Sequence, residues 1–292
     1  MTGRAAVLDP HELVLGVVRL VSLPEVCLRV SEMLDEPNTS AMDLGRVISR
    51  DTGLTARLLK IVNSAFYGFP SRIETVTRAI TIIGMRELRG LVLAASVIEA
   101  FAQIPNRLLN MSAFWRHSVY CGVVAQLLAG QCRVLHSERL FVAGLLHDVG
   151  KLILCHRLPG KMEQITQLVA NCGMAVGQAE REVLGFDHAD VGGALLREWK
   201  MPSALQVAVE FHHRPGAAEQ DALDAAIVHI ANVMTAMAEE GIDNAEPVTD
   251  IDPAAWRITG LDRAVMDEIF VEAGPRFDEA LDLILPRSQH PR

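Results

Sequence analysis

The sequence has few cysteines, and none of them stand in a C-x-x-C spacing. The five are Cys27, Cys121, Cys132, Cys155 and Cys172. An odd number without paired spacing argues against a disulfide framework and against a thiolate metal site. We therefore expect reduced thiols that pack mostly as small apolar side chains, as in a cytoplasmic protein.

The chain also lacks an apolar run long enough to cross a membrane. Its longest such stretch, residues 90–104, contains Glu99 and falls short of the about 20 residues that a spanning helix needs. Near the N-terminus, Arg4 and Asp9 interrupt the sequence before any run long enough for a signal peptide. These features predict a cytoplasmic location without a membrane anchor.

A basic surface is missing too. The formal net charge is −9 and the pI is about 5.6, and residues 219–282 hold 16 acidic side chains against three arginines. Proteins that bind nucleic-acid backbones need a stripe of basic residues. Direct nucleic-acid binding is therefore not expected, and the acidic stretch is interpreted as a solvated face.

The hydrophobic pattern is helical throughout. Leu58, Leu59 and Val62 recur at spacings of three and four within residues 55–65, Pro24 suits the first turn of a helix over 24–34, and Ser40 with Asp43 resembles a capping box. No long run alternates with period two, and no internal repeat is evident.

We predict an all-α multi-helix bundle, in which an N-terminal helical subdomain packs on a second, larger one. A long apolar helix is expected over 85–102, a domain boundary near Ile104-Pro105-Asn106, a surface loop over 241–253 and a final helix near 262–285. The expected domains are residues 1–105 and residues 106–292, the second with an acidic C-terminal extension. A chain of 292 residues with 50% hydrophobic content can bury such cores.

The dipeptide His147-Asp148 carries the strongest chemical signal. It interrupts an apolar helix pattern that runs from Leu140 to Leu154. Burying an imidazole beside a carboxylate costs free energy unless a metal ion or a hydrogen-bonded partner compensates. Further candidate ligands lie at long intervals on either side of it, namely His117, His188, His212 and His213. A helical bundle could aim them all inward, and mixed imidazole and carboxylate ligands suit iron, manganese, cobalt or zinc.

These residues resemble the HD phosphohydrolase superfamily, and other segments narrow the resemblance to its HDOD family (HD-related output domain). The HD-like segments are His117 and the string G-L-L-H-D-V-G-K over 144–151. The HDOD-like segments are S-L-P-E-V over 22–26, V-I-S-R-D-T-G-L over 47–54, L-K-I-V-N-S-A-F-Y-G over 59–68, A-I-T-I-I-G over 79–84, W-K-M-P over 199–202 and H-H-R-P over 212–215. The resemblance covers about residues 20–215. It implies an HD-like helical fold in the second half and a bacterial signalling output module that acts through protein partners.

The sequence departs from the HD pattern at two places. HD enzymes close their metal site with an aspartate in an A-D pair of a late helix, where this chain has Ala231-Asn232. An amide brings no negative charge, so divalent binding should be weaker. The related HD-GYP phosphodiesterases carry a glycine-tyrosine-proline segment after their histidine pair, which is missing here. Lys151 is kept, and the resemblance gives it the role of contacting a substrate phosphate, with Asp148 as the other catalytic candidate.

Simpler interpretations stand beside these. A lone helical histidine is more often a hydrogen-bonded core residue than a ligand, which we expect for His229 and also for His11, His136, His156 and His290. Lys151 fits equally well as an ion-pair partner of Asp148. Two functions remain open: an output module whose eroded metal site is structural or sensory, and a metal-dependent phosphohydrolase acting on a nucleotide or cyclic dinucleotide.

Overall fold

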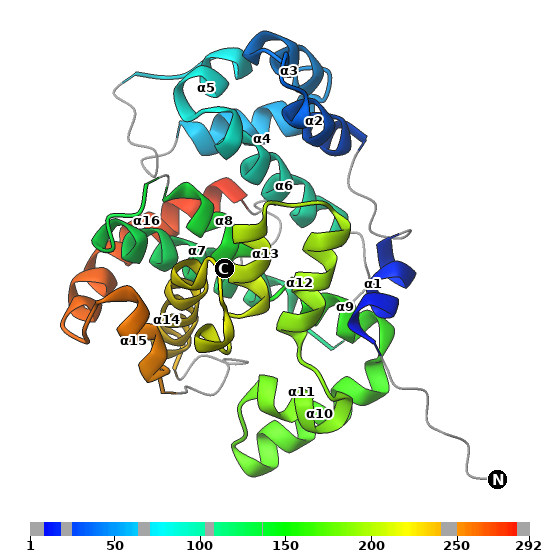
Figure 1. The fold of residues 1–292 in the computed structure, drawn as a ribbon, viewed down its shortest axis with the longest axis vertical. Helices are drawn as coiled ribbons and strands as arrows, with labels where there is room; N and C mark the ends of the chain where they lie inside the picture. The colour runs from blue at the N-terminus through cyan, green and yellow to red at the C-terminus, as the bar shows by residue number, and fades with distance from the viewer. Residues whose placement is uncertain are drawn as a thin grey trace. The chain divides into compact units, whose positions relative to one another are not determined.

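The computed structural model describes residues 9–18, 25–63, 71–102, 108–135, 137–240 and 250–284. These residues form helices and no strand (Figure 1), which confirms the all-α fold class. The helices are α1 Pro10–Val18, α2 Glu25–Asp35, α3 Ala41–Ile48, α4 Thr52–Val62, α5 Val76–Ile83, α6 Met85–Ala102, α7 Met111–Gln131, α8 Glu138–Leu146, α9 Val149–Arg157, α10 Pro159–Cys172, α11 Val176–Leu184, α12 His188–Glu198, α13 Ser203–Glu210, η1 Pro215–Ala217, α14 Ala222–Ala238, α15 Pro253–Thr259 and α16 Val265–Ile284.

Backbone contacts divide the chain into two compact units, each made of separate stretches of sequence. The first unit comprises Met1–Val21, Asn106–Met111 and Leu146–Gly260, and the second comprises Ser22–Pro105, Ser112–Leu145 and Leu261–Arg292. The division into an N-terminal part, 1–105, and a second part, 106–292, stays a prediction.

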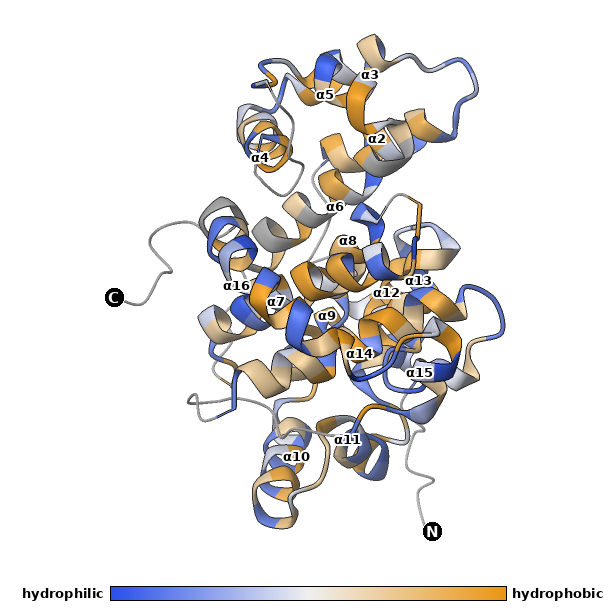
Figure 2. Cartoon of the chain, turned by 90° about the vertical axis from the view of Figure 1, so that its left-hand side faces the viewer, coloured by the Kyte–Doolittle hydropathy of each residue, from blue (hydrophilic) through white to orange (hydrophobic). Residues whose placement is uncertain are grey.

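The first unit holds the helices that matter for the candidate site. Helix α12 packs against α9 and α13, and α14 packs against α13 and α15. Along α12 and α14 nearly every side chain is buried, and the hydropathy colouring of α9 and α14 is mostly apolar (Figure 2). Buried helices of this kind keep polar side chains only where those are paired or functional.

In the second unit, α2 and α4 pack on α6, α3 packs on α5, and α16 packs on α4. Helix α6 spans Met85–Ala102 as predicted. The Ser40–Asp43 capping box is present, and the Asp51 side chain accepts from the backbone N–H of Leu54. Because Asp51 provides this cap, α4 begins at Thr52, three residues earlier than the apolar spacing predicted.

Two expectations for local structure need correction. The apolar pattern over 140–154 is not one helix, because α8 ends at Leu146 and α9 starts at Val149, with His147 and Asp148 in the turn between them. The expected loop over 241–253 ends sooner, because Asp252 caps a short helix that begins at Pro253. The rest of that loop, residues 241–249, lies outside the described residues.

Among the helices that the structure describes, none is both long enough and apolar enough to cross a membrane.

Gly150 allows α9 and α12 to approach each other closely. A Cβ placed on Gly150 would lie 2.0 Å from the backbone oxygen of His188, far inside van der Waals contact. The absence of a side chain at Gly150 therefore allows the close packing of α9 on α12 that brings Asp148 next to His188.

We expect Gly150→Ala to lower the free energy of unfolding by about 1–3 kcal/mol, because the added methyl group must push α12 away. Gly160→Ala on α10 is the matched control, since nothing lies within 4 Å of a Cβ there, and alanine should leave stability unchanged or raise it by up to about 1 kcal/mol. Denaturant unfolding measures both. Equal stability of the two variants would contradict the close packing of α9 on α12.

Candidate metal centre

Asp148 lies at the centre of a buried polar cluster in the first unit. It occupies the N-cap position of α9, yet its side chain makes no cap hydrogen bond, although aspartate is among the residues most suited to that task. Its carboxylate is 2% exposed and points into the protein, where Oδ2 accepts from Nζ of Lys151 at 2.8 Å. The Asp148 side chain therefore interacts within the cluster and does not cap the backbone of α9.

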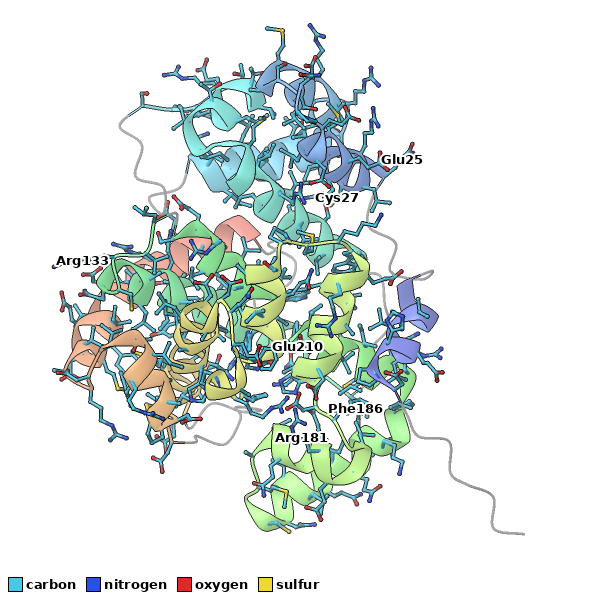
Figure 3. The ribbon with its side chains drawn as sticks, in the orientation of Figure 1. Glu25, Cys27, Arg133, Arg181, Phe186 and Glu210 are labelled. Carbon is cyan, nitrogen blue, oxygen red and sulfur yellow. The ribbon has the colours of Figure 1, made fainter. Side chains whose placement is uncertain are left out.

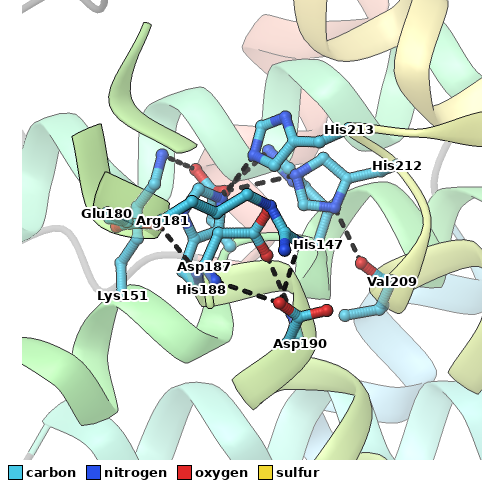
Figure 4. Close-up of polar contacts among 11 residues, drawn as sticks. His147, Lys151, Glu180, Arg181, Asp187, His188, Asp190, Val209, His212 and His213 are labelled. Carbon is cyan, nitrogen blue, oxygen red and sulfur yellow. Dashed lines mark hydrogen bonds and ion pairs between the residues drawn. The ribbon is translucent and has the colours of Figure 1, made fainter. Parts of the chain in front are cut away.

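Three histidine rings surround the other carboxylate oxygen of Asp148. Its Oδ1 lies 3.3 Å from Nε2 of His147, 3.0 Å from Nε2 of His188 and 3.9 Å from Nε2 of His212. A fourth ring, that of His213, places its Nε2 2.9 Å from Nε2 of His188. The close-up in Figure 4 shows these side chains converging.

The backbone around each ring explains its position. His188 opens α12, whose N-terminus is fixed by a capping box between Asp187 and Asp190. Arg181 on α11, labelled in Figure 3, contacts both of these carboxylates at 2.8 Å. The turn after α13 presents His212 and His213, and Glu210 at the end of α13 forms an ion pair with Arg197 of α12. Helices α11, α12 and α13 are therefore linked by ion pairs next to the cluster.

Hydrogen bonds at Nδ1 orient two of the rings. Nδ1 of His188 lies 2.6 Å from Oε2 of Glu180, and Nδ1 of His212 lies 2.7 Å from the carbonyl oxygen of Val209. Both partners are acceptors, so each Nδ1 carries the proton and donates it. Each Nε2 is then the atom that can bind a metal, an arrangement common in metal sites, where an acceptor behind the ring fixes its tautomer.

His229 is a hydrogen-bonded core residue, as expected. Its Nδ1 donates to the carbonyl oxygen of His212 at 2.7 Å, and its Nε2 accepts from the backbone N–H of Asp252 at 2.9 Å. Both nitrogens are used, so His229 supports the His212 turn and offers no ligand atom.

Burial and charge shift the pKa values within the cluster in opposite directions. For Asp148, burial raises the pKa, but His147, Lys151 and His188 outweigh it and hold the value well below the usual range. For His188, burial lowers the pKa, but the carboxylates of Glu180 and Asp148 raise it to about 10. Burial and neighbouring rings keep the pKa values of His212 and His213 well below that of a free imidazole. Without a metal, the His188 ring is thus held as an imidazolium between the carboxylates of Glu180 and Asp148.

The donor set fits a divalent transition metal. Ligand atoms of His188, His212 and His213 all lie within 4.8 Å of one another, and metal–nitrogen bonds of about 2.0–2.1 Å place ligands of one ion about 3–4 Å apart. Within the described part of the chain, the buried Nε2 of His212 has no hydrogen-bond partner. A buried polar atom of this kind is costly unless something binds it, and a metal ion would.

The cluster is bordered by a pocket of about 350 Å³. His213 and Asn232 line it, together with Arg181, Arg214 and Asp252. Both arginines are engaged, since Arg214 contacts Asp190 at 3.0 Å and Arg181 contacts Asp187 and Asp190. Because His213 lines this pocket, solvent and small molecules can reach the His213 side of the cluster.

Several sequence-predicted site residues meet here: His147, Asp148, Lys151, His188, His212 and His213. Lys151 is the ion-pair partner of Asp148. His117 is buried on α7 in the second unit, and its role as a ligand stays a prediction. Asn232 lines the adjoining pocket, and ligation by its amide also stays a prediction. His11 and His156 are exposed, while His136 and His290 lie outside the described residues.

Sequence reasoning missed Glu180. It is fully buried and accepts from both Nδ1 and the backbone N–H of His188. The sign that could have revealed it is an acidic residue on the buried side of α11, where Ala179 and Leu184 are also buried. That signal alone does not reveal which ring the carboxylate serves.

Comparison with known proteins identifies the family. The HDOD domain model matches residues 20–215. The chain belongs to the HDOD family. An uncharacterised protein of Treponema pallidum (strain Nichols) is 26% identical over 202 residues, which cover 68% of this chain and 38% of that relative. The chain therefore matches well under half the length of this relative.

Two solved structures share the fold of this HDOD chain. One is an HDOD domain protein of unknown function from Geobacter sulfurreducens, with 24% identity, a TM-score of 0.75 and coverage of 95% of this chain and 99% of that one. The other comes from Shewanella amazonensis SB2B and is provisionally described as a phosphohydrolase, with 24% identity, a TM-score of 0.73 and coverage of 94% and 98%. At this level of identity the likeness shows the fold alone.

We expect Glu180→Gln to weaken zinc or cobalt binding about 10- to 100-fold, because an amide holds the His188 ring less strongly than a carboxylate does. Glu182→Gln is the matched control, since Glu182 is exposed on the same helix and its replacement should leave affinity unchanged. Competition with a chromophoric chelator measures both. Equal affinities would show that Glu180 does not support a metal ligand.

Metal binding should also release a proton. At pH 7.5 the raised pKa of His188 keeps its ring protonated, so an ion bound at Nε2 must displace about one proton. Affinity should accordingly rise with pH toward 10. Calorimetry in two buffers of different ionisation enthalpy counts the protons, and Glu180→Gln, which removes the main cause of the raised pKa, should reduce the number. Binding without proton release in the wild type would rule out His188 as a ligand.

Proposed function

We propose that this chain is a signalling output module of the HDOD type that acts through protein partners. In this proposal the HD-derived centre binds one divalent metal ion for structure or sensing and does not hydrolyse phosphate esters efficiently.

The observation that carries this proposal is the state of Lys151. Its ammonium group is 4% exposed and donates to Asp148 at 2.8 Å. A lysine that contacts a substrate phosphate must present its charge to a space that the substrate can enter. Lys151 instead neutralises the carboxylate at the centre of the cluster, so the group most suited to phosphate binding is used internally.

The ligands in this proposal are Nε2 of His188, Nε2 of His212 and Oδ1 of Asp148. His147 and His213 stand next to them and could complete the coordination sphere, and His117 and Asn232 are further candidates from the family resemblance. Imidazole with carboxylate favours iron, manganese, cobalt or zinc. Such an ion would supply Lewis acidity to a bound water or anion.

A metal-dependent phosphohydrolase is the second candidate. It is favoured by the pocket beside His213, which is wide enough for a small ligand and has Arg181 and Arg214 in its wall. The related Shewanella structure, provisionally described as a phosphohydrolase, agrees with this alternative at the level of fold. Both arginines already have aspartate partners, which leaves less positive charge for a phosphate.

Hydrolysis assays with manganese, iron, cobalt or zinc separate the two candidates. We expect little or no turnover of cyclic di-GMP by the wild-type protein. Asn232→Asp should raise metal occupancy, because it adds the negative charge that HD enzymes have at this place, and Asn171→Asp on the exposed side of α10 controls for the added charge. Elemental analysis reads out occupancy separately from activity.

Fast metal-dependent turnover by the wild type that is lost in Asp148→Ala would overturn the output-module proposal and establish the enzyme. A protein that binds no metal and whose melting temperature does not respond to a chelator would leave a hydrogen-bonded cluster in place of a metal centre.

A further inference from the structure

In the second unit, α3 and α5 present a basic and partly apolar face. The helices pack closely, since a Cβ on Gly45 of α3 would lie 2.3 Å from Oγ1 of Thr77 on α5. Met42 is 56% exposed, Ile82 43% and Met85 39%. Met42 and Ile82 each lie four residues from an exposed arginine of the same helix, Arg46 and Arg78 respectively. Arg50 follows α3, and Met85 begins α6, three residues after Ile82.

Little acidic charge offsets these arginines. Arg46 is 3.6 Å from Asp43, but neither Arg50 nor Arg78 forms an ion pair with any residue that the structure describes. Glu74 is the other exposed acid nearby, at the turn before α5. We call this surface, comprising Met42, Arg46, Arg50, Arg78, Ile82 and Met85, the basic face.

Helix α16 of the same unit presents the opposite pattern. Val271 is 78% exposed, and the exposed charged residues around it along the helix are all acidic: Asp267, Glu268, Glu272 and Asp278. Among these four described side chains, only Glu272 lies in an ion pair, with Arg276 at 3.2 Å. We call this surface the acidic face.

The two faces lie on different helices of one copy. Helix α4 packs against both α5 and α16, while the basic and acidic faces are turned toward solvent. Each face combines exposed apolar side chains with charge of one sign, and the signs are opposite. Such complementarity steers association and fixes which surfaces meet.

We propose that the acidic face of α16 in one copy docks on the basic face of α3 and α5 in a second copy. Val271 would lie among Met42, Ile82 and Met85, and the carboxylates would lie opposite the arginines. The contact joins different surfaces of the two copies, so it generates a ring if the rotation closes and a longer chain if it does not. This assembly is independent of the metal centre.

Charge reversal on the full-length protein tests the proposal. Sedimentation velocity over a range of concentrations at low salt should show self-association of the wild type that weakens at high salt. Arg50→Glu with Arg78→Glu, and separately Glu268→Lys with Asp278→Lys, should each raise the dissociation constant at least tenfold. Lys161→Glu with Arg257→Glu, at exposed positions in the first unit, changes the net charge as much as the first pair and should have no such effect.

Mixing decides whether these two faces meet each other. Each reversed variant alone has two faces of like charge, whereas an equimolar mixture offers both complementary pairs and should associate again. All four substitutions in one chain should also restore self-association. Circular dichroism and melting temperature check that every variant folds.

A wild type that stays monomeric at about 100 µM in low salt, where opposite charges attract most strongly, would overturn the proposal. So would a wild-type oligomer that both reversed variants retain, or reversed variants that do not associate when mixed. In the first case another protein with an acidic helix becomes the candidate occupant of the basic face.

Discussion

The buried carboxylate of Asp148 is the constraint on which the rest of the first unit depends. A charge with 2% exposure is tolerable only when it is paired and hydrogen-bonded. Lys151 on the same helix supplies one partner, and rings from α12 and the turn after α13 supply the others. The rings of His188 and His212 are themselves buried, so each needs a partner at its Nδ1, and Glu180 and the carbonyl oxygen of Val209 provide these contacts. One buried charge thus determines which polar groups four helical segments must bring inward.

Whether a feature of the fold could be predicted from the sequence depends on how far apart in the chain the interacting residues lie. The capping box at Ser40 was predictable because it involves residues three apart. The break at His147–Asp148 was not predicted, because apolar residues on both sides continue the helical pattern. The carboxylate turns toward the rings of His188 and His212, which lie 40 and 64 residues further along the chain. Gly150 shows the same difficulty. Its need for close packing on the backbone of His188 leaves no trace in local periodicity.

The candidate ligands were largely predictable from the sequence, but the residues that hold their rings in place were not. Histidines in apolar surroundings are conspicuous in a sequence because burial makes them costly. Glu180 and His229 act on ligands from other helices, and nothing in their own segments distinguishes them from ordinary core or cap residues. The structure supplies the missing information as hydrogen-bond direction: acceptors lie behind His188 and His212, and these acceptors leave each Nε2 facing Asp148.

The same contacts limit how many metal ions the cluster can hold. Among Asp148, Glu180, Lys151 and His188 without a metal, two carboxylates meet one ammonium and one imidazolium, which the raised pKa of His188 maintains. One divalent ion that displaces the His188 proton leaves a single excess positive charge, which a bound hydroxide or other anion can neutralise. A second ion would add two more positive charges, and Asn232 in the adjoining pocket brings no carboxylate to offset them. Because uncompensated buried charge is strongly unfavourable, these charges agree with the proposal of one ion that binds beside an internally paired lysine and serves structure or sensing.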